Sequence, residues 1–300
     1  MKMNKATRCI KHITCIVMVI LCSVTFGYAQ KKEKAFSFAF FTDIHLSLHP
    51  NKCFEGLDQA IAKAKDLGVD FIITGGDNVN IDVAKNDTAT IRQLFERFKY
   101  IVDNSDIKIY PAIGNHDRYK GEWNKEAMLD EGMHERYLGK SYYSFNHKGW
   151  HFVILNTVQR SDSLGYPCVG EQQVEWLAAD LNKKENQLPT IVVGHVPLVT
   201  TTYMANGKRV SPDLATNGVE ILGMLKEHSF RLLLQGHKHV YEEVLSAGMQ
   251  VVNGGAISAA WWGGAFREGT EEGFVLVNTY KDGTYDWKYI DYGWVVEKKE

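Results

Sequence analysis

The sequence predicts an α/β fold in which two mixed β-sheets stack on each other and helices flank them. The chain alternates apolar runs of strand length with amphipathic runs of helix length. Its first half follows the β-α-β-α-β order that builds parallel sheets, and its second half contains closely spaced strands that favour antiparallel pairing. With 300 residues, 45% of them hydrophobic and 23% charged, the chain can bury a substantial core. This composition excludes disordered, collagen-like and multi-span membrane proteins.

The first half is expected to contain three strands separated by two helices. The strands are apolar runs at residues 36–41, 69–74 and 107–113. The helices are residues 54–67 and 88–102, where apolar residues recur at helical spacing.

The second half is expected to begin with a hairpin. Its strands, 142–145 and 150–156, flank the turn sequence Asn146-His147-Lys148-Gly149. The remaining expected elements are helices 171–181 and 218–227 and strands 190–193, 231–234, 240–245, 249–252, 274–278 and 285–290.

Residues 1–29 have the pattern of a secretory signal peptide. Four basic residues precede a mostly apolar, uncharged run at 13–26, and Gly27 and Ala29 are small residues before a cut after Ala29. The alternative is a single anchoring helix, but the run is shorter than the roughly 20 residues that span a bilayer. We therefore expect an exported protein, periplasmic or extracellular, with one domain at residues 30–300. Stable membrane insertion is expected only if the signal stays uncleaved.

Loss of the signal changes the charge and the cysteine count. Residues 1–29 carry four positive charges and no negative charge, so the net charge would change from −2 to −6. A polymer of nucleic acid is therefore not an expected partner, because such binding needs a basic face. Only Cys53 and Cys168 remain, either as one disulfide or as two buried thiols.

Polar segments follow five of the predicted strands. Ligand sites of α/β sheets form at the carboxyl ends of strands, so we expect these segments to converge on one edge. Residues two apart in an extended stretch project to the same side. Each Asp-x-His or His-x-His pair is then expected to serve a common site. The segments are Asp43-Ile44-His45, Gly76-Asp77, Gly114-Asn115-His116-Asp117, Gly194-His195 and Gly236-His237-Lys238-His239.

The side chains in these segments are typical ligands of transition metals. Carboxylates, an amide oxygen and imidazoles suit Mn, Fe, Zn, Co or Ni better than calcium. These side chains exceed the ligand set of one ion, so we expect two ions with Asp77 as the bridge. The ion pair is expected to activate a hydroxide, which attacks a phosphoryl group. His116 is expected beyond the metals, where it protonates the leaving alkoxide or offsets charge on the phosphoryl oxygens, with Asp117 orienting its ring.

Together the five segments, between about residues 36 and 239, resemble the signatures of the calcineurin-like metallophosphoesterase superfamily. The resemblance implies a four-layer α/β/β/α sandwich and a dinuclear centre of Fe, Mn or Zn ions. It also implies His116 as the catalytic histidine. The implied ligands are Asp43, His45 and His239 for one ion, Asn115, His195 and His237 for the other, and Asp77 as the bridge.

One departure from a branch of this superfamily is informative. Purple acid phosphatases have a tyrosine three residues after the bridging aspartate, where this chain has Asn80. An iron(III)–tyrosinate site is therefore not expected, and the chain looks most like the bacterial, cyclic-nucleotide phosphodiesterase-like branch. The expected activity is hydrolysis of small-molecule phosphodiesters or phosphomonoesters. A strict phosphomonoesterase, similar to an acid phosphatase or nucleotidase, and a non-catalytic metal-binding scaffold are the alternatives.

Five further residues are candidates for binding the substrate. Arg118 and Tyr119 follow the third motif, with plain loop packing as the alternative. Asn253 is either a hydrogen-bond donor in the pocket or a turn residue. Trp261 and Trp262 lie between two glycine pairs, where they either stack on an aromatic group of the substrate or pack at the edge of the sandwich.

Overall fold

The computed structural model describes residues 32–48, 52–85, 87–119, 130–161, 165–202, 213–246 and 248–296. The contacts of the chain separate residues 1–33 from a unit that begins at Lys34, and every element below belongs to that second unit. The expected signal segment, residues 1–29, lies outside the described residues.

The first sheet has five strands in the order β13-β12-β1-β2-β3. Strands β1, β2 and β3 are parallel, and β12 and β13 add antiparallel strands at one side. Phe41 pairs with Thr74, so β1 and β2 end at the same level of the sheet. The strands are β1 (Lys34–Phe41), β2 (Phe71–Thr74), β3 (Lys108–Tyr110), β12 (Gly273–Tyr280) and β13 (Tyr285–Asp291).

The second sheet has six strands in the order β10-β11-β9-β8-β5-β4. Its four inner strands are parallel, and β10 and β4 are antiparallel edges. Val193 pairs with Leu234, so β8 and β9 also end close together. The strands are β4 (Tyr143–His147), β5 (Trp150–Ile154), β8 (Thr190–Val193), β9 (Phe230–Gln235), β10 (Tyr241–Ser246) and β11 (Met249–Gly254).

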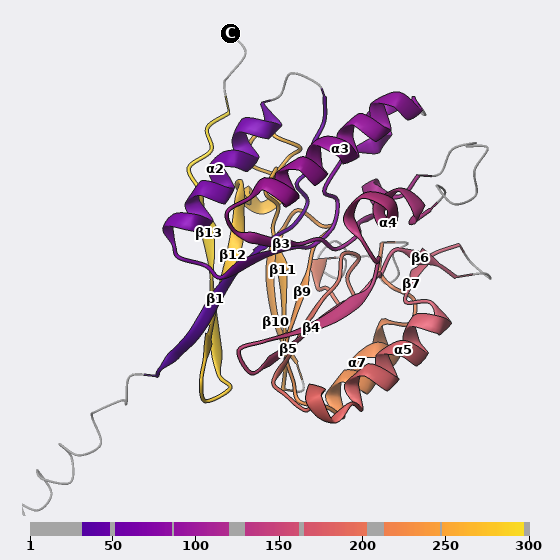
Figure 1. Cartoon of the computed structure of the whole chain (residues 1–300), viewed down its shortest axis with the longest axis vertical. Helices are drawn as coiled ribbons and strands as arrows, with labels where there is room; N and C mark the ends of the chain where they lie inside the picture. The colour runs from indigo at the N-terminus through magenta and orange to yellow at the C-terminus, as the bar shows by residue number, and fades with distance from the viewer. Residues whose placement is uncertain are drawn as a thin grey trace, which may run out of the picture. The chain divides into compact units, whose positions relative to one another are not determined.

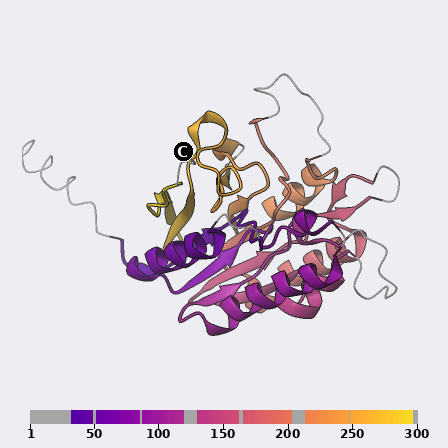
Figure 2. The same cartoon turned by 90° about the horizontal axis from the view of Figure 1, so that it is seen from above.

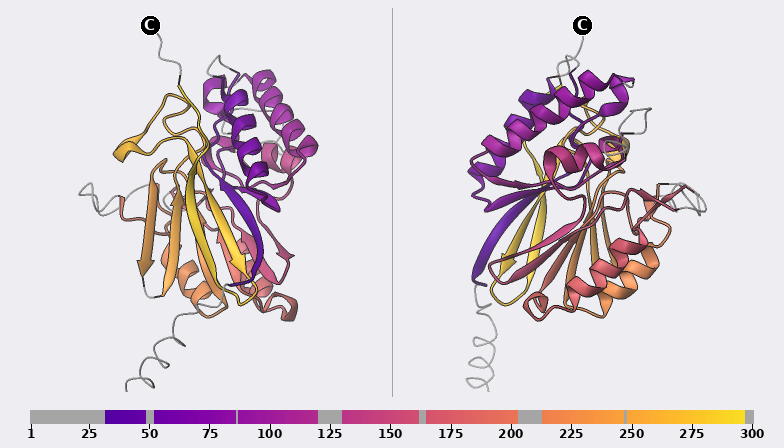
Figure 3. Two further views of the ribbon diagram at one scale, coloured as in Figure 1. Left: turned by 90° about the vertical axis from the view of Figure 1, so that its left-hand side faces the viewer. Right: turned by 45° about the vertical axis from the view of Figure 1, so that its right-hand side comes forward.

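Helices cover the outer faces of both sheets (Figures 1 and 3). Helices α2 (Cys53–Asp66), α3 (Thr88–Asn104) and α4 (Gly132–Leu138) lie over the first sheet. Helices α5 (Glu171–Leu181) and α7 (Gly218–Lys226) lie over the second. The order helix, sheet, sheet, helix confirms the four-layer α/β/β/α sandwich.

The alternation of side chains along the strands explains why four layers form. In β1, Phe38 and Phe40 point into the cluster between the sheets, whereas Ala39 and Phe41 join the cluster beneath α2 and α3. In β8, Val192 packs instead toward α5 and α7. Both faces of these strands are buried, which is why they appear in the sequence as continuous apolar runs. Each buried phenylalanine contributes about 1.5–3 kcal/mol to stability.

Most expected elements are present within one to three residues of their predicted ends, but some differ. The third strand was expected at 107–113 and pairs only over Lys108–Tyr110, because Pro111 has no amide hydrogen to extend the ladder. The short helix α4 and the hairpin of β6 (Gln159–Arg160) and β7 (Pro167–Cys168) were not predicted. The 3₁₀ helices are η1 (Ile81–Ala84), η2 (Asn115–Asp117), η4 (Lys184–Asn186) and η5 (Arg267–Gly269).

The two cysteines outside the expected signal segment are buried thiols rather than a disulfide. Cys53 begins α2 and donates to the Ser47 carbonyl oxygen at 3.1 Å, and Cys168 lies in β7. Within the described ranges, none of the helices combines the length and the apolar character needed to cross a bilayer.

Candidate metal centre

All five polar segments meet at one edge, where the strands of both sheets end. The loops after β1, β2 and β3 come from the first sheet, and the loops after β8 and β9 come from the second. Backbone hydrogen bonds join these loops: the Asp43 amide donates to the Gly76 carbonyl at 3.1 Å, and the Gly236 amide donates to the His195 carbonyl at 3.0 Å. Figure 2 shows the crowded loops above the strands. The arrangement therefore depends on both sheets.

Asp43, His45 and His239 form one compact group of buried metal-ligating side chains. The His239 Nε2 atom lies 3.1 Å from Asp43 Oδ1 and 3.0 Å from His45 Nε2. His45 Nε2 is 3.8 Å from the same carboxylate oxygen. Three ligand atoms from the first and last motifs thus point at one position.

Asp77, His195 and His237 form a second group. His195 Nε2 lies 3.1 Å from Asp77 Oδ2, and Asn115 Oδ1 lies 3.0 Å from the same nitrogen. The Asp77 Oδ2 atom is also 3.6 Å from His45 Nε2, a member of the first group. Asp77 therefore lies between the two groups.

The hydrogen bonds behind the imidazoles fix which nitrogen faces the site. The Nδ1 atoms of His195 and His239 lie at hydrogen-bond distance from the Gly75 and Ala259 carbonyl oxygens, so each donates its proton there. In the neutral rings the Nε2 atoms then carry lone pairs directed at other acceptors. Lone pairs that face one another in this way repel unless a cation lies between them. The nitrogen and oxygen atoms of the site therefore fit a pair of transition-metal ions.

The protonation states also suit cations. Burial alone would raise the pKa of Asp77, but the charge of His195 and its contact outweigh burial and hold that pKa well below its usual value. Burial lowers the pKa of His45 to about 3, so this ring is neutral near pH 7. Despite its burial, the charge of Asp77 raises the pKa of His195 to about 9, so this ring is protonated near pH 7 and gives up its proton when an ion binds. The carboxylates therefore stabilise positive charge at this place.

The backbone of these loops is not extended, which corrects one expectation. Asp43, His45, Asp77, His237 and His239 all have φ between 50° and 73°, in the left-handed region. Such residues turn the chain sharply. As a result His237 and His239 point into different groups rather than a common one, whereas Asp43 and His45 do share a group.

Two glycines are required by close approach. A Cβ atom on Gly114 would lie 2.0 Å from the Asp77 amide nitrogen, and one on Gly236 would lie 2.0 Å from Thr42 Oγ1. Both distances are too short for any side chain. The glycines therefore allow neighbouring motifs to touch.

His116 lies beside the two groups, and with His45 and Asp77 it forms a third cluster of possible ligand atoms. Its ring meets that of His45 edge to face, with centroids 4.9 Å apart, and its backbone amide donates to Asp77 Oδ1 at 2.7 Å. Its Nδ1 atom lies 2.8 Å from Asp82 Oδ2. Burial lowers the pKa of this imidazole, but the contact with Asp82 and the charge of Asp77 raise it above its usual value overall.

Asp117 has a different role from the expected one. Its buried carboxylate accepts hydrogen bonds from the backbone amides of Asn78, Val79 and Gly114, at 3.2, 2.9 and 2.8 Å. Asp117 thereby joins the loop of the second motif to that of the third. The carboxylate beside the ring of His116 belongs to Asp82 instead. Burial raises the pKa of Asp117 to about 7.

Four of the five candidates for binding substrate are engaged elsewhere. Arg118 is buried and pairs with Asp130 at 2.5 Å, and Tyr119 lies in the core beneath α3 and α4. The side-chain oxygen Oδ1 of Asn253 accepts a hydrogen bond from Gln235 Nε2 at 2.9 Å. The Trp262 Nε1 atom donates to the Ile44 carbonyl at 2.9 Å, and its ring is buried. Arg118, Tyr119 and Trp262 are therefore packed within the fold, and Asn253 lies inside strand β11 rather than in a turn.

Trp261 is the exception, because 44% of it is exposed and its ring lies 4.5 Å from that of His239. Sequence reasoning missed two carboxylates at the site. Asp82 lies beside His116, and Asp213 Oδ1 lies 3.7 Å from His237 Nε2. Neither belongs to a motif, so only the folded chain reveals them.

Comparison with known proteins places this geometry in a family. The model of the calcineurin-like phosphoesterase family matches residues 36–241, more than half of the chain. A search of curated proteins found no match.

Three solved structures share the fold. A dimetal phosphatase from Danio rerio superposes with a TM-score of 0.61 at 15% identity, covering 86% of this chain and 96% of that chain. The purple acid phosphatase PPD1 from yellow lupin (Lupinus luteus) gives 0.58 at 15% identity, over 86% of this chain and 52% of that one, so the present chain matches about half of its length. GAP50, described as the anchor in the inner membrane complex of Plasmodium, gives 0.53 at 15% identity, over 87% and 85%.

These identities show a common fold, and the family match extends across all five motifs. The family implies a dinuclear metal centre, which agrees with the two ligand groups around Asp77. The chain therefore belongs to the calcineurin-like phosphoesterase family and is a metallophosphoesterase.

Proposed function

We propose that this protein is an exported, metal-dependent hydrolase of small-molecule phosphodiesters or phosphomonoesters, with residues 1–29 as a signal peptide and the catalytic domain at 30–300. The observation that carries the activity is the position of Asp77 between two groups of ligands. The expected signal sequence supports export, and the N-terminal sequence of protein recovered outside the cytoplasm tests it. A first residue other than Gln30 would refute cleavage after Ala29.

The metal-holding residues are assigned in two sets. Asp43, His45 and His239 would hold one ion, Asn115, His195 and His237 would hold the other, and Asp77 would contribute to both positions. When bound, a pair of Fe, Mn or Zn ions lowers the pKa of water and neutralises charge on phosphoryl oxygens. Asp43 and Asp77 are ionised near pH 7, because their pKa values are lowered by the neighbouring histidines despite burial, so the ligand set is ready to bind cations.

His116 is assigned as the general acid. It lies at the edge of the ligand groups and is partly exposed, so it can reach a bound ester from the solvent side. Asp82 beside Nδ1 holds the ring so that Nε2 can donate a proton to the leaving alkoxide. Asp117 acts indirectly, because its carboxylate joins the loops that carry Asp77 and His116.

The test is the variant His116→Ala in metal-loaded protein. We expect turnover of an alkyl phosphodiester, whose leaving alkoxide needs a proton, to fall about 10²–10⁴-fold, the usual contribution of general acid catalysis, while metal content stays nearly constant. Metal content is measured by atomic spectrometry on the same samples. Loss of both ions would instead make His116 a ligand or a structural support.

A non-catalytic scaffold is the second candidate, and the likeness to GAP50, described as an anchor, favours it. A scaffold does not need His116 and Asp82 at contact distance beside a complete ligand set. A panel of cyclic nucleotides, nucleotides, sugar phosphates and phospholipid head groups separates the candidates. Hydrolysis of monoesters alone would indicate a strict phosphomonoesterase, and hydrolysis of none by fully loaded protein would favour the scaffold.

A further inference from the structure

We propose that Trp261 and Phe266 form an aromatic wall beside the metal centre that selects phosphate esters whose organic group is planar and aromatic, such as a nucleobase or an aryl ring. This inference rests on the proposed hydrolase function and specifies its substrate class. Trp261 would act as a specificity-determining residue rather than a participant in bond cleavage.

The position of Trp261 is the first argument. Its ring lies 4.5 Å from that of His239 and 5.7 Å from that of His45, two residues of the first ligand group. Phe266 meets it edge to face at 5.6 Å and also lies 5.4 Å from the ring of His239. His45 in turn contacts His116. A run of rings therefore connects the general acid to Trp261, and a phosphate at the metal centre places its organic group within reach of this wall.

The exposure of Trp261 is the second argument. Among the tryptophans that the structure describes, it is the one classed as exposed, although it lies next to buried imidazoles. Its neighbour Trp262 is buried against Gly56 and bonded to Ile44. Core packing thus accounts for Trp262, whereas the ring of Trp261 is open to a ligand directly beside His239.

The backbone of the loop is the third argument. Ala259, Trp261 and Trp262 have φ of 39°, 51° and 69°, in the left-handed region that is unfavourable for residues with a side chain. The loop is held in place because Ser258 Oγ donates to the Asp43 carbonyl at 2.7 Å and the Ala259 carbonyl accepts from His239. A strained loop bonded to two metal-site residues keeps Trp261 rigid, as a stacking surface requires.

The chemistry of the wall defines the ligand. A tryptophan face and a phenylalanine edge bind flat π-systems better than saturated groups of equal size. Arg267 lies over the Phe266 ring, 5.3 Å from its centroid, and adds positive charge at the rim, which suits an anionic ester.

The test uses pairs of phosphomonoesters in which both members release a primary alkoxide and only one member carries an aromatic group. Adenosine 5′-monophosphate and ribose 5-phosphate differ by the base, and benzyl phosphate and cyclohexylmethyl phosphate differ by the planarity of the ring. The ratio of kcat/KM within each pair is measured for metal-loaded wild type, Trp261→Ala and Trp261→Phe, with metal content determined on each sample.

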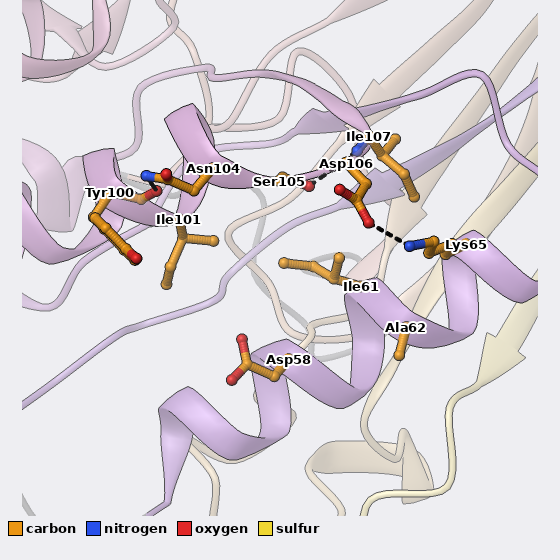
Figure 4. Close-up of a pocket in the computed structure, with 10 residues that line it drawn as sticks. All are labelled: Asp58, Ile61, Ala62, Lys65, Tyr100, Ile101, Asn104, Ser105, Asp106 and Ile107. Atoms are coloured by element: carbon orange, nitrogen blue, oxygen red, sulfur yellow. Dashed lines mark hydrogen bonds and ion pairs between the residues drawn. The ribbon is translucent and has the colours of Figure 1, made fainter.

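The control is Tyr100→Ala. Tyr100 is an exposed aromatic residue in a separate groove of about 350 Å³ between α2 and α3, which the ion pair of Lys65 and Asp106 borders (Figure 4). None of the residues that line this groove belongs to the five motifs. The substitution removes an exposed aromatic ring as in Trp261→Ala, but away from the metal centre.

We expect wild type to prefer the aromatic member by about tenfold or more in at least one pair, the preference that stacking of one ring provides. Trp261→Ala should bring that ratio close to one, Trp261→Phe should keep most of it, and Tyr100→Ala should keep all of it. If wild type prefers the aromatic member only in the adenosine pair, the ligand is a nucleobase. If it prefers the aromatic member only in the benzyl pair, the ligand is a simple aryl group.

The outcomes separate this inference from the proposed function. If the wild type shows no preference, or if Trp261→Ala lowers kcat/KM equally within both pairs, Trp261 only supports His239 and the inference is wrong while the hydrolase remains. If neither these monoesters nor the diesters of the panel above are hydrolysed, the hydrolase proposal fails. The affinity of metal-loaded protein for the two members of each pair, measured by calorimetry, then tests the aromatic wall. Equal affinities within the pairs would overturn it.

Discussion

At the scale of single residues, the metal centre depends on side chains in unfavourable backbone conformations. The five left-handed residues of the site would each cost of order 1–3 kcal/mol in isolation. Hydrogen bonds between loops hold them, for example from the His45 amide to the Asp77 carbonyl at 2.8 Å. The strain is therefore supported by the neighbouring motif rather than by the residue's own strand.

Asp77 is the residue on which both ligand groups depend. Its Oδ2 atom lies 3.1 Å from His195 and 3.6 Å from His45, so Asp77→Ala should lower the occupancy of both metal positions. Metal content per chain after dialysis measures this. Asp58→Ala, at an exposed position on α2, is the matched control and should load fully. Full dinuclear loading of Asp77→Ala would exclude the bridging role.

Asp82 should act by positioning the ring of His116. Without the carboxylate 2.8 Å from Nδ1, the ring loses one restraint, so we expect Asp82→Asn to lower kcat about tenfold, part of the 10²–10⁴-fold effect of general acid catalysis. KM and metal content should change little, and Asp82→Glu should restore part of kcat. A rise in KM with unchanged kcat would show that Asp82 contacts substrate instead.

The same residues show how far the sequence could predict the site. All seven expected ligands come together because each follows the end of a strand, and strand ends can be recognised from apolar runs. The sequence could not show where the ring of His116 points, so it predicts Asp117, the neighbour in the chain, as the orienting carboxylate and does not indicate Asp82. Asp213 contacts His237 across 24 positions of sequence with no motif to mark it.

At the scale of elements, predictability follows length and pattern. Long apolar runs such as β1 and the amphipathic α3 were expected nearly as found. Helix α4 was missed because it has seven residues and begins with a glycine, and β6 and β7 have two residues each. Such short elements depend on contacts formed elsewhere in the fold rather than on a local repeat.

Helix α4 carries a titratable residue that should affect stability. His134 is fully buried, and neither ring nitrogen has a hydrogen-bond partner among the described residues. Burial lowers its pKa to about 3, so the unfolded chain takes up the proton first. The free energy of unfolding is therefore unaffected by His134 above pH 6.5. As the pH falls from 6.5 toward 3, it decreases by about 1.4 kcal/mol per pH unit.

We therefore expect wild type to lose about 2 kcal/mol more unfolding free energy than His134→Leu between pH 7 and pH 5. Urea denaturation of chelator-treated protein at the two pH values measures the difference. His228→Leu, at a half-buried position beyond α7, should follow wild type. Equal losses in wild type and His134→Leu would show that His134 takes up its proton in the folded state as readily as in the unfolded chain.

At the scale of the whole molecule, metal binding should stabilise the sandwich, because the ligands come from loops of both sheets. An ion that binds only the folded chain adds about 2.7 kcal/mol at a hundredfold excess over its Kd, which raises Tm by about 5–10 °C. Calorimetry with and without chelator measures this. The Tm of Asp77→Ala should respond much less. An equal response in both proteins would place the stabilising ion elsewhere.

The union of the two sheets at the metal centre also sets an order of events during biosynthesis. The His237 amide meets the Asp43 carboxylate across 194 positions of sequence, at 2.9 Å. A ribosome must therefore release nearly the whole polypeptide before the first ligand group is complete. Metal uptake is then a late step of maturation, and a chain that crosses a membrane unfolded would acquire its ions from the compartment in which it arrives.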